Sequence, residues 1–517
     1  MIDVGVEPPR LVIDHAVNSS YVALSYCWGE PQLITLTTQS MSILKDGIDA
    51  NLLPRTIQDA ITVTRRLQQQ YLWVDALCVI QDDESTRAQD ISTMHDIYAN
   101  AFLTICASNA GKCSMGFLKN FTELFPSAIR VPIHLPGSTA GTLILRKELS
   151  LVRQARTPLD LRAWAYQEAA LSPRKLIFDS IVYLECSHTP LQSRWMSYDS
   201  FIKPAEYEMF RVTRYNSLID YDTLSSKLVK VDIFNGCKLS STLDKAMIHA
   251  QNNWKDHVSE YSRRKLTRDD DKLPAFTGLA AEFARSTGFR YLAGLWQETL
   301  LVDLLWHVSP PSRCSRLQTR RAPSWSWASV EGYVSVSTVR HLRSYESYSA
   351  PYLAELRFVL EVLTVACTPV FSTAIYGENL QGTLRVRGHL IAVHYIGKSS
   401  GFGEVFGSRL RDLDEALSGD LSTVDDILIV RELNLASAGD VVYLSAILDT
   451  LDDVADASAR LHADYWVLPV MDNRGLILSR CSAGVYRRIG HFQADEVASD
   501  LFRSLQSTRE PAILDII

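Results

Sequence analysis

The feature that most constrains the fold is an alternation of strand-like and helix-like segments in the first third of the chain. Residues 21–27, 71–75 and 102–106 are short apolar runs rich in β-favouring residues. Between these runs, apolar residues recur at helical spacing over 57–67 and again over 91–101. Strands that alternate with helices predict a parallel sheet with right-handed crossovers. We therefore expect an α/β domain at this end of the chain.

Two further local patterns extend this prediction. Thr56 followed by Asp59 resembles a capping box at the start of the first helix. Residues 164–171 favour a helix, and residues 175–178 and 182–186 favour strands. The α/β pattern is therefore expected to continue to about residue 190.

The pattern changes twice in the rest of the chain. Residues 205–310 are mostly helical by pattern, most clearly over 243–261 and 292–308. Short alternating strands follow at 383–396, 441–448, 465–470, 476–478 and 486–492. A chain of 517 residues has room for roughly three domains at about 150 residues each. We expect an α/β domain at 1–190, a helical region at 191–334 and a β-rich domain at 335–517.

Composition excludes several classes of function. The chain has 52 Lys+Arg against 59 Asp+Glu, which offers no overall basic field for nucleic acid. Nine cysteines, with no CxxC pair, argue against a disulfide framework and a Cys-rich metal site, and no metal is expected. The first residues lack the apolar core of a signal peptide, and no membrane span is expected. The sequence therefore favours a cytoplasmic protein.

Polar side chains cluster where the first two strands are expected to end. In open α/β sheets, ligands bind outside the carboxyl ends of the strands. The candidates for that crevice are Ser25, Tyr26, Cys27, Trp28 and Gly29 after the first strand, and Asp75, Cys78, Gln81, Asp82 and Asp83 after the second. Asp75 follows Leu72-Trp73-Val74 directly, and a carboxylate that leaves a core there needs a partner or a function.

Less specific interpretations stay open for these residues. Cys27 and Cys78 are better explained as small core residues, because free cysteine is among the most buried residue types. Asp82 and Asp83 would also serve as caps of the next helix.

A third candidate segment is Arg162–Glu168, which lies before Ser172-Pro173. Glu168 could act as a general acid or base, or as a carboxylate that binds ribose, with Arg162 and Gln167 beside it. The alternative is a structural ion-pair network between Arg162 and Glu168.

Taken together, these segments resemble the fungal heterokaryon-incompatibility (HET) domain family. The resemblance rests on YVALSYCWG at 21–29, LPRTIQDAITVTRRLQQQYLWVDALCVIQDD at 53–83, MHDIYANA at 94–101 and RAWAYQEAALSPRKLIF at 162–178. The segments YSRRKLTRDDDKLPAFTGLAA at 261–281, YLAGLW at 291–296 and PSWSWAS at 323–329 resemble the region that follows the domain in many such proteins. Four motifs in order make the resemblance specific for about residues 20–180.

The resemblance implies a fold and a biological role. The fold would be a flavodoxin-like or TIR-like parallel sheet, since the HET domain has been viewed as a remote relative of TIR domains. The role would be fungal nonself recognition and programmed cell death, through self-association or another incompatibility protein. Some TIR domains cleave NAD, so NAD is implied as a substrate.

Three functions therefore compete. The first is a nucleotide hydrolase in which Glu168 or Asp75 is the catalytic carboxylate. The second is a non-enzymatic signalling module in which the motifs are scaffold. The third is a hydrolase that uses the thiol of Cys27 or Cys78 with a histidine such as His95.

Overall fold

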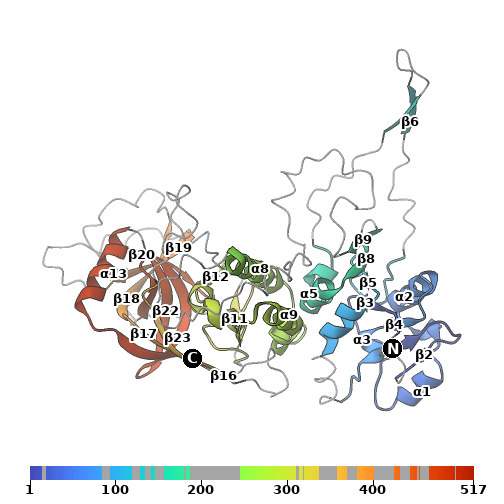
Figure 1. The fold of residues 1–517 in the computed structure, drawn as a ribbon, viewed down its shortest axis with the longest axis horizontal. Helices are drawn as coiled ribbons and strands as arrows, with labels where there is room; N and C mark the ends of the chain where they lie inside the picture. The colour runs from blue at the N-terminus through green and yellow to red at the C-terminus, as the bar shows by residue number, and fades with distance from the viewer. Residues whose placement is uncertain are drawn as a thin grey trace. The chain divides into compact units, whose positions relative to one another are not determined.

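The chain divides into two compact units, Met1–Ser217 and Leu218–Ile517, in the computed structural model (Figure 1). The structure describes residues 1–13, 19–83, 93–118, 129–133, 141–145, 156–179, 182–186, 245–309, 314–317, 320–336, 358–368, 381–400, 424–430, 443–450, 453, 465–494 and 496–517. Helices and a β-rich sheet share the second unit, and the division into three domains stays a prediction.

The first unit is built on a seven-stranded mixed sheet in the order β2-β1-β4-β3-β5-β8-β9. Its strands are β1 (Ile2–Asp3), β2 (Arg10–Leu11), β3 (Tyr21–Ser25), β4 (Tyr71–Trp73), β5 (Leu103–Cys106), β8 (Arg174–Phe178) and β9 (Val182–Cys186). The central strands β4, β3, β5 and β8 are parallel, as predicted. The outer strands β1, β2 and β9 pair antiparallel, so the sheet is mixed rather than wholly parallel.

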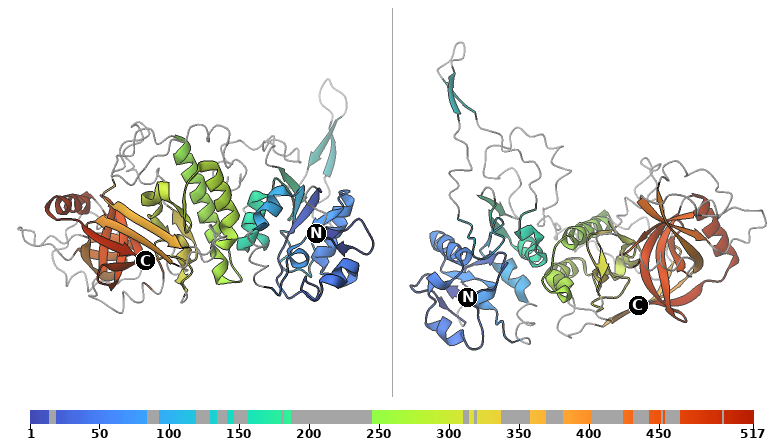
Figure 2. Two further views of the ribbon diagram at one scale, coloured as in Figure 1. Left: turned by 60° about the horizontal axis from the view of Figure 1, so that its bottom comes forward. Right: turned by 180° about the vertical axis from the view of Figure 1, so that it is seen from behind.

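Alternation along β3 builds a core on each face of this sheet. Val22 and Leu24 pack with the apolar side of α2 (Arg55–Arg66). Tyr21 and Ala23 point the other way, into a cluster with Tyr98 from the helical residues 93–100. Successive strand residues face opposite sides, which explains this division. The helices α2 and α5 (Ala163–Leu171) consequently lie on opposite sides of the sheet (Figure 2).

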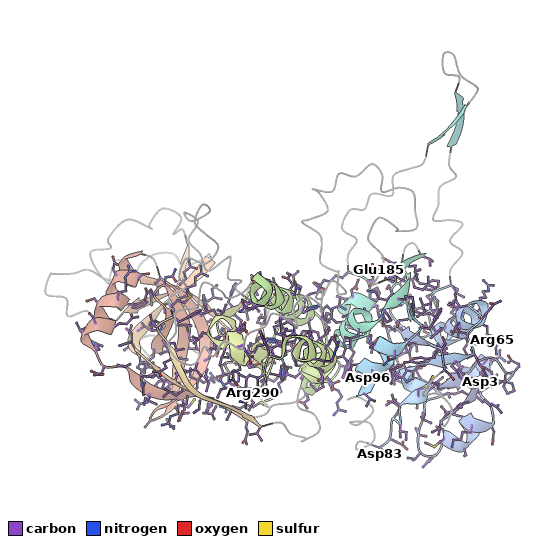
Figure 3. The ribbon with its side chains drawn as sticks, viewed as in Figure 1. Asp3, Arg65, Asp83, Asp96, Glu185 and Arg290 are labelled. Atoms are coloured by element: carbon purple, nitrogen blue, oxygen red, sulfur yellow. The ribbon has the colours of Figure 1, made fainter. Side chains whose placement is uncertain are left out.

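The two edges of the sheet are tied by ion pairs. Glu185 on β9, labelled in Figure 3, pairs with Lys175 on β8 at 2.9 Å. Arg65 lies toward the other end, where its guanidinium contacts Glu7 at 2.7 Å. The second pair is exposed and contributes little to stability.

The helix start at α2 differs from the predicted capping box. Pro54 is the N-cap residue, and no side chain caps the helix. Asp59 is buried and instead accepts hydrogen bonds from the backbone N–H of Phe117 (2.8 Å) and Leu118 (3.0 Å), while Arg55 pairs with it at 3.1 Å. Asp59 therefore anchors the segment that follows β5, a long-range contact that local spacing does not reveal.

The second unit begins, within its described residues, with helices packed around aromatic rings. These helices are α8 (Lys245–Ser262) and α9 (Thr277–Thr287). Trp254 lies 5.1 Å from Phe283 and 4.9 Å from Trp296 between ring centroids. Aromatic pairs at such separations add to the stability that burial alone provides.

The helix expected over 292–308 is wrong. The structure has a hairpin of β10 (Tyr291–Leu292) and β11 (Leu295–Trp296), then the short α10 (Leu300–Asp303) and β12 (Trp306–Val308). Ala293 and Gly294 both have positive φ, 48° and 93°, which turns the chain between the strands. That backbone conformation is incompatible with a continuous helix.

The β-rich end forms a nine-stranded sheet in the order β16-β17-β24-β23-β20-β19-β18-β21-β22. The strands are β16 (Glu361–Thr368), β17 (Gln381–Gly388), β18 (Ile391–Ser400), β19 (Val424–Val430), β20 (Tyr443–Leu448), β21 (Tyr465–Met471), β22 (Arg474–Ser482), β23 (Val485–Gln493) and β24 (Ala512–Ile516). The helix α13 (Glu496–Thr508) adds Phe502 to the core. A β-rich C-terminal region is confirmed.

A buried ion pair joins this sheet to β12. The Arg488 guanidinium donates to Asp449 Oδ2 at 3.2 Å and to the Leu304 carbonyl at 2.6 Å, and it lies 3.4 Å from the Trp306 ring centroid. Both charged side chains are fully buried. Within the described part of the chain, no helix combines the length and the apolar character needed to span a membrane.

Candidate functional site

Three of the predicted segments meet at the carboxyl ends of the central parallel strands. The chain leaves β3 at Tyr26, leaves β4 into the short helix α3 (Asp75–Cys78), and enters α5 at Arg162. The Trp28 indole Nε1 donates to Asp75 Oδ2 at 2.8 Å. The Arg162 guanidinium donates to the backbone carbonyl of Tyr26. These contacts hold the three segments together around Asp75.

Asp75 is half-buried at the surface, but its carboxylate is enclosed by donors. Asp75 Oδ1 accepts the backbone N–H of Ala76 at 2.7 Å, beside the Trp28 bond to Oδ2. Burial raises the pKa of Asp75 above its usual value, and Arg162, Trp28, Ala76 and Tyr26 oppose that rise. The carboxylate therefore stays out of bulk water only because a cation and several donors surround it.

Glu168 lies deeper, on α5, with 2% of its surface exposed. Burial raises its pKa, the Asp75 charge raises it further, and Arg162 lowers it. The hydroxyls of Ser25 and Tyr98 lie near enough to lower it as well. By strict hydrogen-bond geometry, however, neither Glu168 Oε2 nor Ser25 Oγ has a partner among the described residues. A buried carboxylate oxygen without a partner is rare and costly, which marks Glu168 as unusual.

Arg162 is the cation that serves both carboxylates. Burial lowers the pKa of its guanidinium, but Glu168 and Asp75 outweigh burial and raise it. Arg162 is the extended N-cap residue of α5 (φ −84°, ψ 131°), so its side chain is not confined to the spacing of helical faces. The cluster thus has one positive and two negative side chains, a formal charge of −1 when all are ionised.

Cys27 lies in the core, whereas Cys78 is half-buried and packs against the core. Cys27 is 5% exposed and packs with Cys106 and Leu159. Burial raises the pKa of the Cys27 thiol, which disfavours the reactive thiolate. Cys78 Sγ accepts a hydrogen bond from the Val74 backbone at 3.5 Å.

The histidine proposed to activate a thiol is engaged elsewhere. His95 Nε2 lies 3.3 Å from Asp96. A thiol hydrolase needs a base in contact with the nucleophile. The described contacts therefore favour the other two hypotheses.

The residues after α3 mainly hold loops together. Gln81 Nε2 donates to the carbonyls of Asp75 (3.2 Å) and Val79 (2.8 Å). Asp82 accepts from the Thr38 backbone (2.9 Å) and hydroxyl (2.7 Å), and these hydrogen bonds lower its pKa. Asp83 follows it and is labelled in Figure 3. These contacts connect the loop before α1 (Met41–Asp46) to the site.

Gly29 and Gln167 shape the surroundings. Gly29 has φ +65°, and a Cβ there would lie 2.6 Å from the Gly111 carbonyl oxygen. The turn after Trp28 therefore requires glycine. Gln167 is 1% exposed, next to Glu168 on α5. It is a buried neighbour of the cluster.

Two contributors were not predicted from the sequence. Gln32 Nε2 donates to the Tyr26 hydroxyl at 2.8 Å, and the Tyr98 hydroxyl donates to the Leu24 carbonyl at 3.1 Å. Tyr98 lies inside the segment MHDIYANA, so its motif was a signal, whereas Gln32 had none. Among the described residues, no group of three or more His, Cys, Asp or Glu side chains is arranged to hold a metal ion.

Comparison with known families agrees with this part of the chain. The family model of the heterokaryon incompatibility protein (HET) matches residues 21–168, which include all three segments of the site. Neither curated proteins nor solved structures gave a match to the chain. The resemblance stated from the four motifs is confirmed over these residues, and it indicates a role in heterokaryon incompatibility.

Proposed function

We propose that this HET domain acts in nonself recognition and cell death as a hydrolase of ribonucleotides such as NAD. The observation that carries the proposal is the pair of carboxylates, Asp75 and Glu168, gathered around the cation Arg162 at the carboxyl ends of parallel strands. Ligands of open α/β sheets bind at this position. The strand order β4-β3-β5-β8 also supports a flavodoxin-like or TIR-like fold.

The chemistry would use negative charge to stabilise a cationic sugar. The bond between ribose C1′ and the nicotinamide nitrogen breaks, and its electron pair leaves with nicotinamide. The oxocarbenium-like centre would be stabilised by Asp75, a half-buried residue, together with the buried Glu168. Water then adds to C1′, and its proton passes to a carboxylate and on to solvent.

The test is release of nicotinamide from NAD by the purified full-length protein. It is run over a range of protein concentrations, because self-association or an incompatibility partner would activate such a domain. We expect release that Asp75→Asn abolishes and that Cys27→Ser leaves in place. Absence of nicotinamide in every oligomeric state would refute the hydrolase.

A second function is favoured by the hydrogen bonds themselves. Trp28 and Ala76 both donate to Asp75, and Arg162 donates to the Tyr26 carbonyl, as expected for a scaffold that joins three segments. In that case the domain is a non-enzymatic assembly module. Asp75→Asn and Glu168→Gln would then destabilise the domain, and the wild-type protein would release no nicotinamide from NAD.

A further inference from the structure

A pair of histidines lies together in the second unit, outside the site described above. The His307 ring on β12 and the His491 ring on β23 are 5.8 Å apart between centroids. His491 is 4% exposed, and His307 is half-buried. His307 Nδ1 and His491 Nε2 are shielded from solvent, and neither makes a hydrogen bond with the described residues. Buried nitrogens of this kind call for a partner such as an ordered water or an ion.

The register of β22 and β23 places two arginines on the same face of the sheet as His491. His491 pairs with Leu476 on β22. The register then shifts by one residue, so that Arg488 pairs with Leu478. Since Leu476 and Leu478 are two residues apart and share a face, this β-bulge brings Arg488 to the face of His491. Arg474 on β22 shares that face too, in a position diagonal to His491 that long side chains can span.

Arg488 also joins this face to the strand that carries His307. Its guanidinium donates to the carbonyls of Leu304 and Trp306, and Trp306 directly precedes His307 on β12. The guanidinium lies 3.4 Å from the centroid of the Trp306 ring. These contacts hold β12 against the face of the sheet that carries His491 and Arg474.

The ion-pair network next to the two histidines has more cations than anions. Arg316 pairs with Asp449 at 2.8 Å and with Asp453 at 3.1 Å. Arg488 also pairs with Asp449, and Arg487 also pairs with Asp453. Three arginines therefore share two aspartates, which leaves the network with one excess positive charge. Such surroundings favour an anion over a metal cation.

The two histidine rings can act as neutral donors toward that anion. Burial lowers the pKa of His307 to about 4 and also lowers the pKa of His491, and Arg474 and Arg488 act in the same direction. A neutral imidazole keeps one N–H, which can lie on the nitrogen that lacks a partner. With the Arg474 guanidinium, the donors come from three strands. The tetrahedral oxygens of a phosphate group accept from several directions, and guanidinium groups bind them well.

We infer that His307, His491 and Arg474 form a binding site for a phosphate group, free or as a monoester, between β12 and the strands β22 and β23. His491 forms the floor of the site, and the half-buried His307 and Arg474 lie on the side from which the ligand enters. The site belongs to the second unit and is independent of the proposed hydrolase.

Isothermal titration calorimetry of the full-length protein tests the site, with inorganic phosphate and methyl phosphate as ligands at constant ionic strength in chloride. We expect saturable binding to the wild-type protein. Tighter binding of methyl phosphate would identify a monoester as the ligand, and tighter binding of inorganic phosphate would identify the free anion. Arg474→Gln should weaken the binding about tenfold or more, because a hydrogen bond between two charged groups is lost.

Arg480→Gln is the matched control. Arg480 is an exposed arginine on the same strand, six residues and roughly 20 Å further along, so the substitution removes the same charge away from the site. It should change the affinity by less than about twofold, because salt screens charges at that distance.

His491→Phe keeps a ring in the core but removes the donor, and it should also weaken binding about tenfold. Should this variant fail to fold, Arg474→Gln tests the site from a half-buried position. Absence of saturable phosphate binding by the wild-type protein would show that ordered water alone satisfies the two nitrogens, and it would overturn the inference. Equal affinities of Arg474→Gln and Arg480→Gln would overturn it as well.

Discussion

At the scale of single residues, the site combines charges in a way that costs stability. Asp75 and Glu168 share one guanidinium, and burial raises the pKa of both carboxyl groups. An excess of buried charge is the kind of local strain that functional sites retain. The free energy of unfolding of variants in this cluster can therefore distinguish a catalytic role of the carboxylates from a purely structural one.

The first prediction concerns Glu168→Gln. Removing one carboxylate leaves Arg162 balanced by Asp75, so we expect the free energy of unfolding at neutral pH to rise by on the order of 1 kcal/mol. Chemical denaturation of the full-length protein measures this change. A scaffold role predicts the reverse sign, because a stabilising ion pair would be lost.

The sign of the pH dependence follows from the same shift. The pKa of Glu168 is raised in the folded protein above its usual 4.5, so the folded state binds the proton more tightly than the unfolded state. The contribution of Glu168 to stability is therefore fully present below 4.5 and is lost as pH rises through the raised value. The stability gain of Glu168→Gln should accordingly appear above pH 4.5 and grow before it levels off. A gain that shrinks with rising pH would contradict this account.

Arg162→Gln should act in the opposite direction. Two buried carboxylates would then lack a counter-charge, and we expect a loss of about 3 kcal/mol at neutral pH. Arg65→Gln is the control: it breaks the exposed pair with Glu7 and the hydrogen bonds to the carbonyls of Val4 and Val6, but it leaves no buried charge unpaired, so the loss should be about 1–2 kcal/mol. Equal effects of the two substitutions would argue against a buried cluster.

Residue identities were predictable where a side chain follows a strand end. The sequence singles out Asp75, because a carboxylate directly after a buried strand needs a partner, and Asp75 has several. No sequence pattern marks Gln32, because its contact with Tyr26 depends on how the loop folds back and not on spacing. The shared role of Arg162 was missed for a similar reason, since helical spacing does not limit an N-cap side chain.

At the scale of elements, apolar periodicity predicted the helices and strands correctly, except where a backbone turn or a long-range contact intervened. Strands β3, β4 and β5 and the helix between β3 and β4 follow directly from apolar periodicity. The segment 292–308 has the same apolar content, but positive φ at Ala293 and Gly294 breaks it into a hairpin. Asp59 fits a capping box locally but bonds to Phe117 and Leu118. The periodicity of apolar residues does not predict long-range hydrogen-bond partners or turns of the backbone.

Gly29→Ala tests the turn that carries Trp28. A Cβ at Gly29 would meet backbone atoms of Gly111 and Lys112, so both strain and collision are expected. We expect a loss of about 2–3 kcal/mol in the free energy of unfolding. Gly288→Ala is the control: φ is +72° there, but nothing lies within 4 Å of the added carbon, so only about 1 kcal/mol should be lost. Equal losses would mean that the Gly111 contact is unimportant.

At the scale of the whole molecule, the chain consists of two compact units. An N-terminal α/β part and a β-rich end were predictable because the spacing of their apolar residues differs. In the first part, segments of helical spacing alternate with short strands, whereas in the second part apolar residues recur at every second position. The division of the chain near Ser217 was not predictable from the sequence. The helical and β-rich segments of the second unit have different apolar patterns, and nothing in these patterns indicates that the segments form one compact unit.

Calorimetry of Arg488→Met tests whether the units unfold separately. Arg488 and Asp449 are both fully buried in the second unit, and removal of one partner should cost roughly 3–5 kcal/mol. We expect two unfolding transitions. Arg488→Met should lower the midpoint temperature of one of them and leave unchanged the transition that Glu168→Gln shifts. A single transition that both substitutions move would show one cooperative molecule.

Nicotinamide release from NAD by the full-length Glu168→Gln protein, beside wild type and the surface control Glu7→Gln, tests the proposed hydrolase. Glu7 is an exposed carboxylate paired only with Arg65 among described contacts. We expect release by wild type and Glu7→Gln and loss to background in Glu168→Gln. Equal release by all three, or none by wild type at any protein concentration, would contradict it.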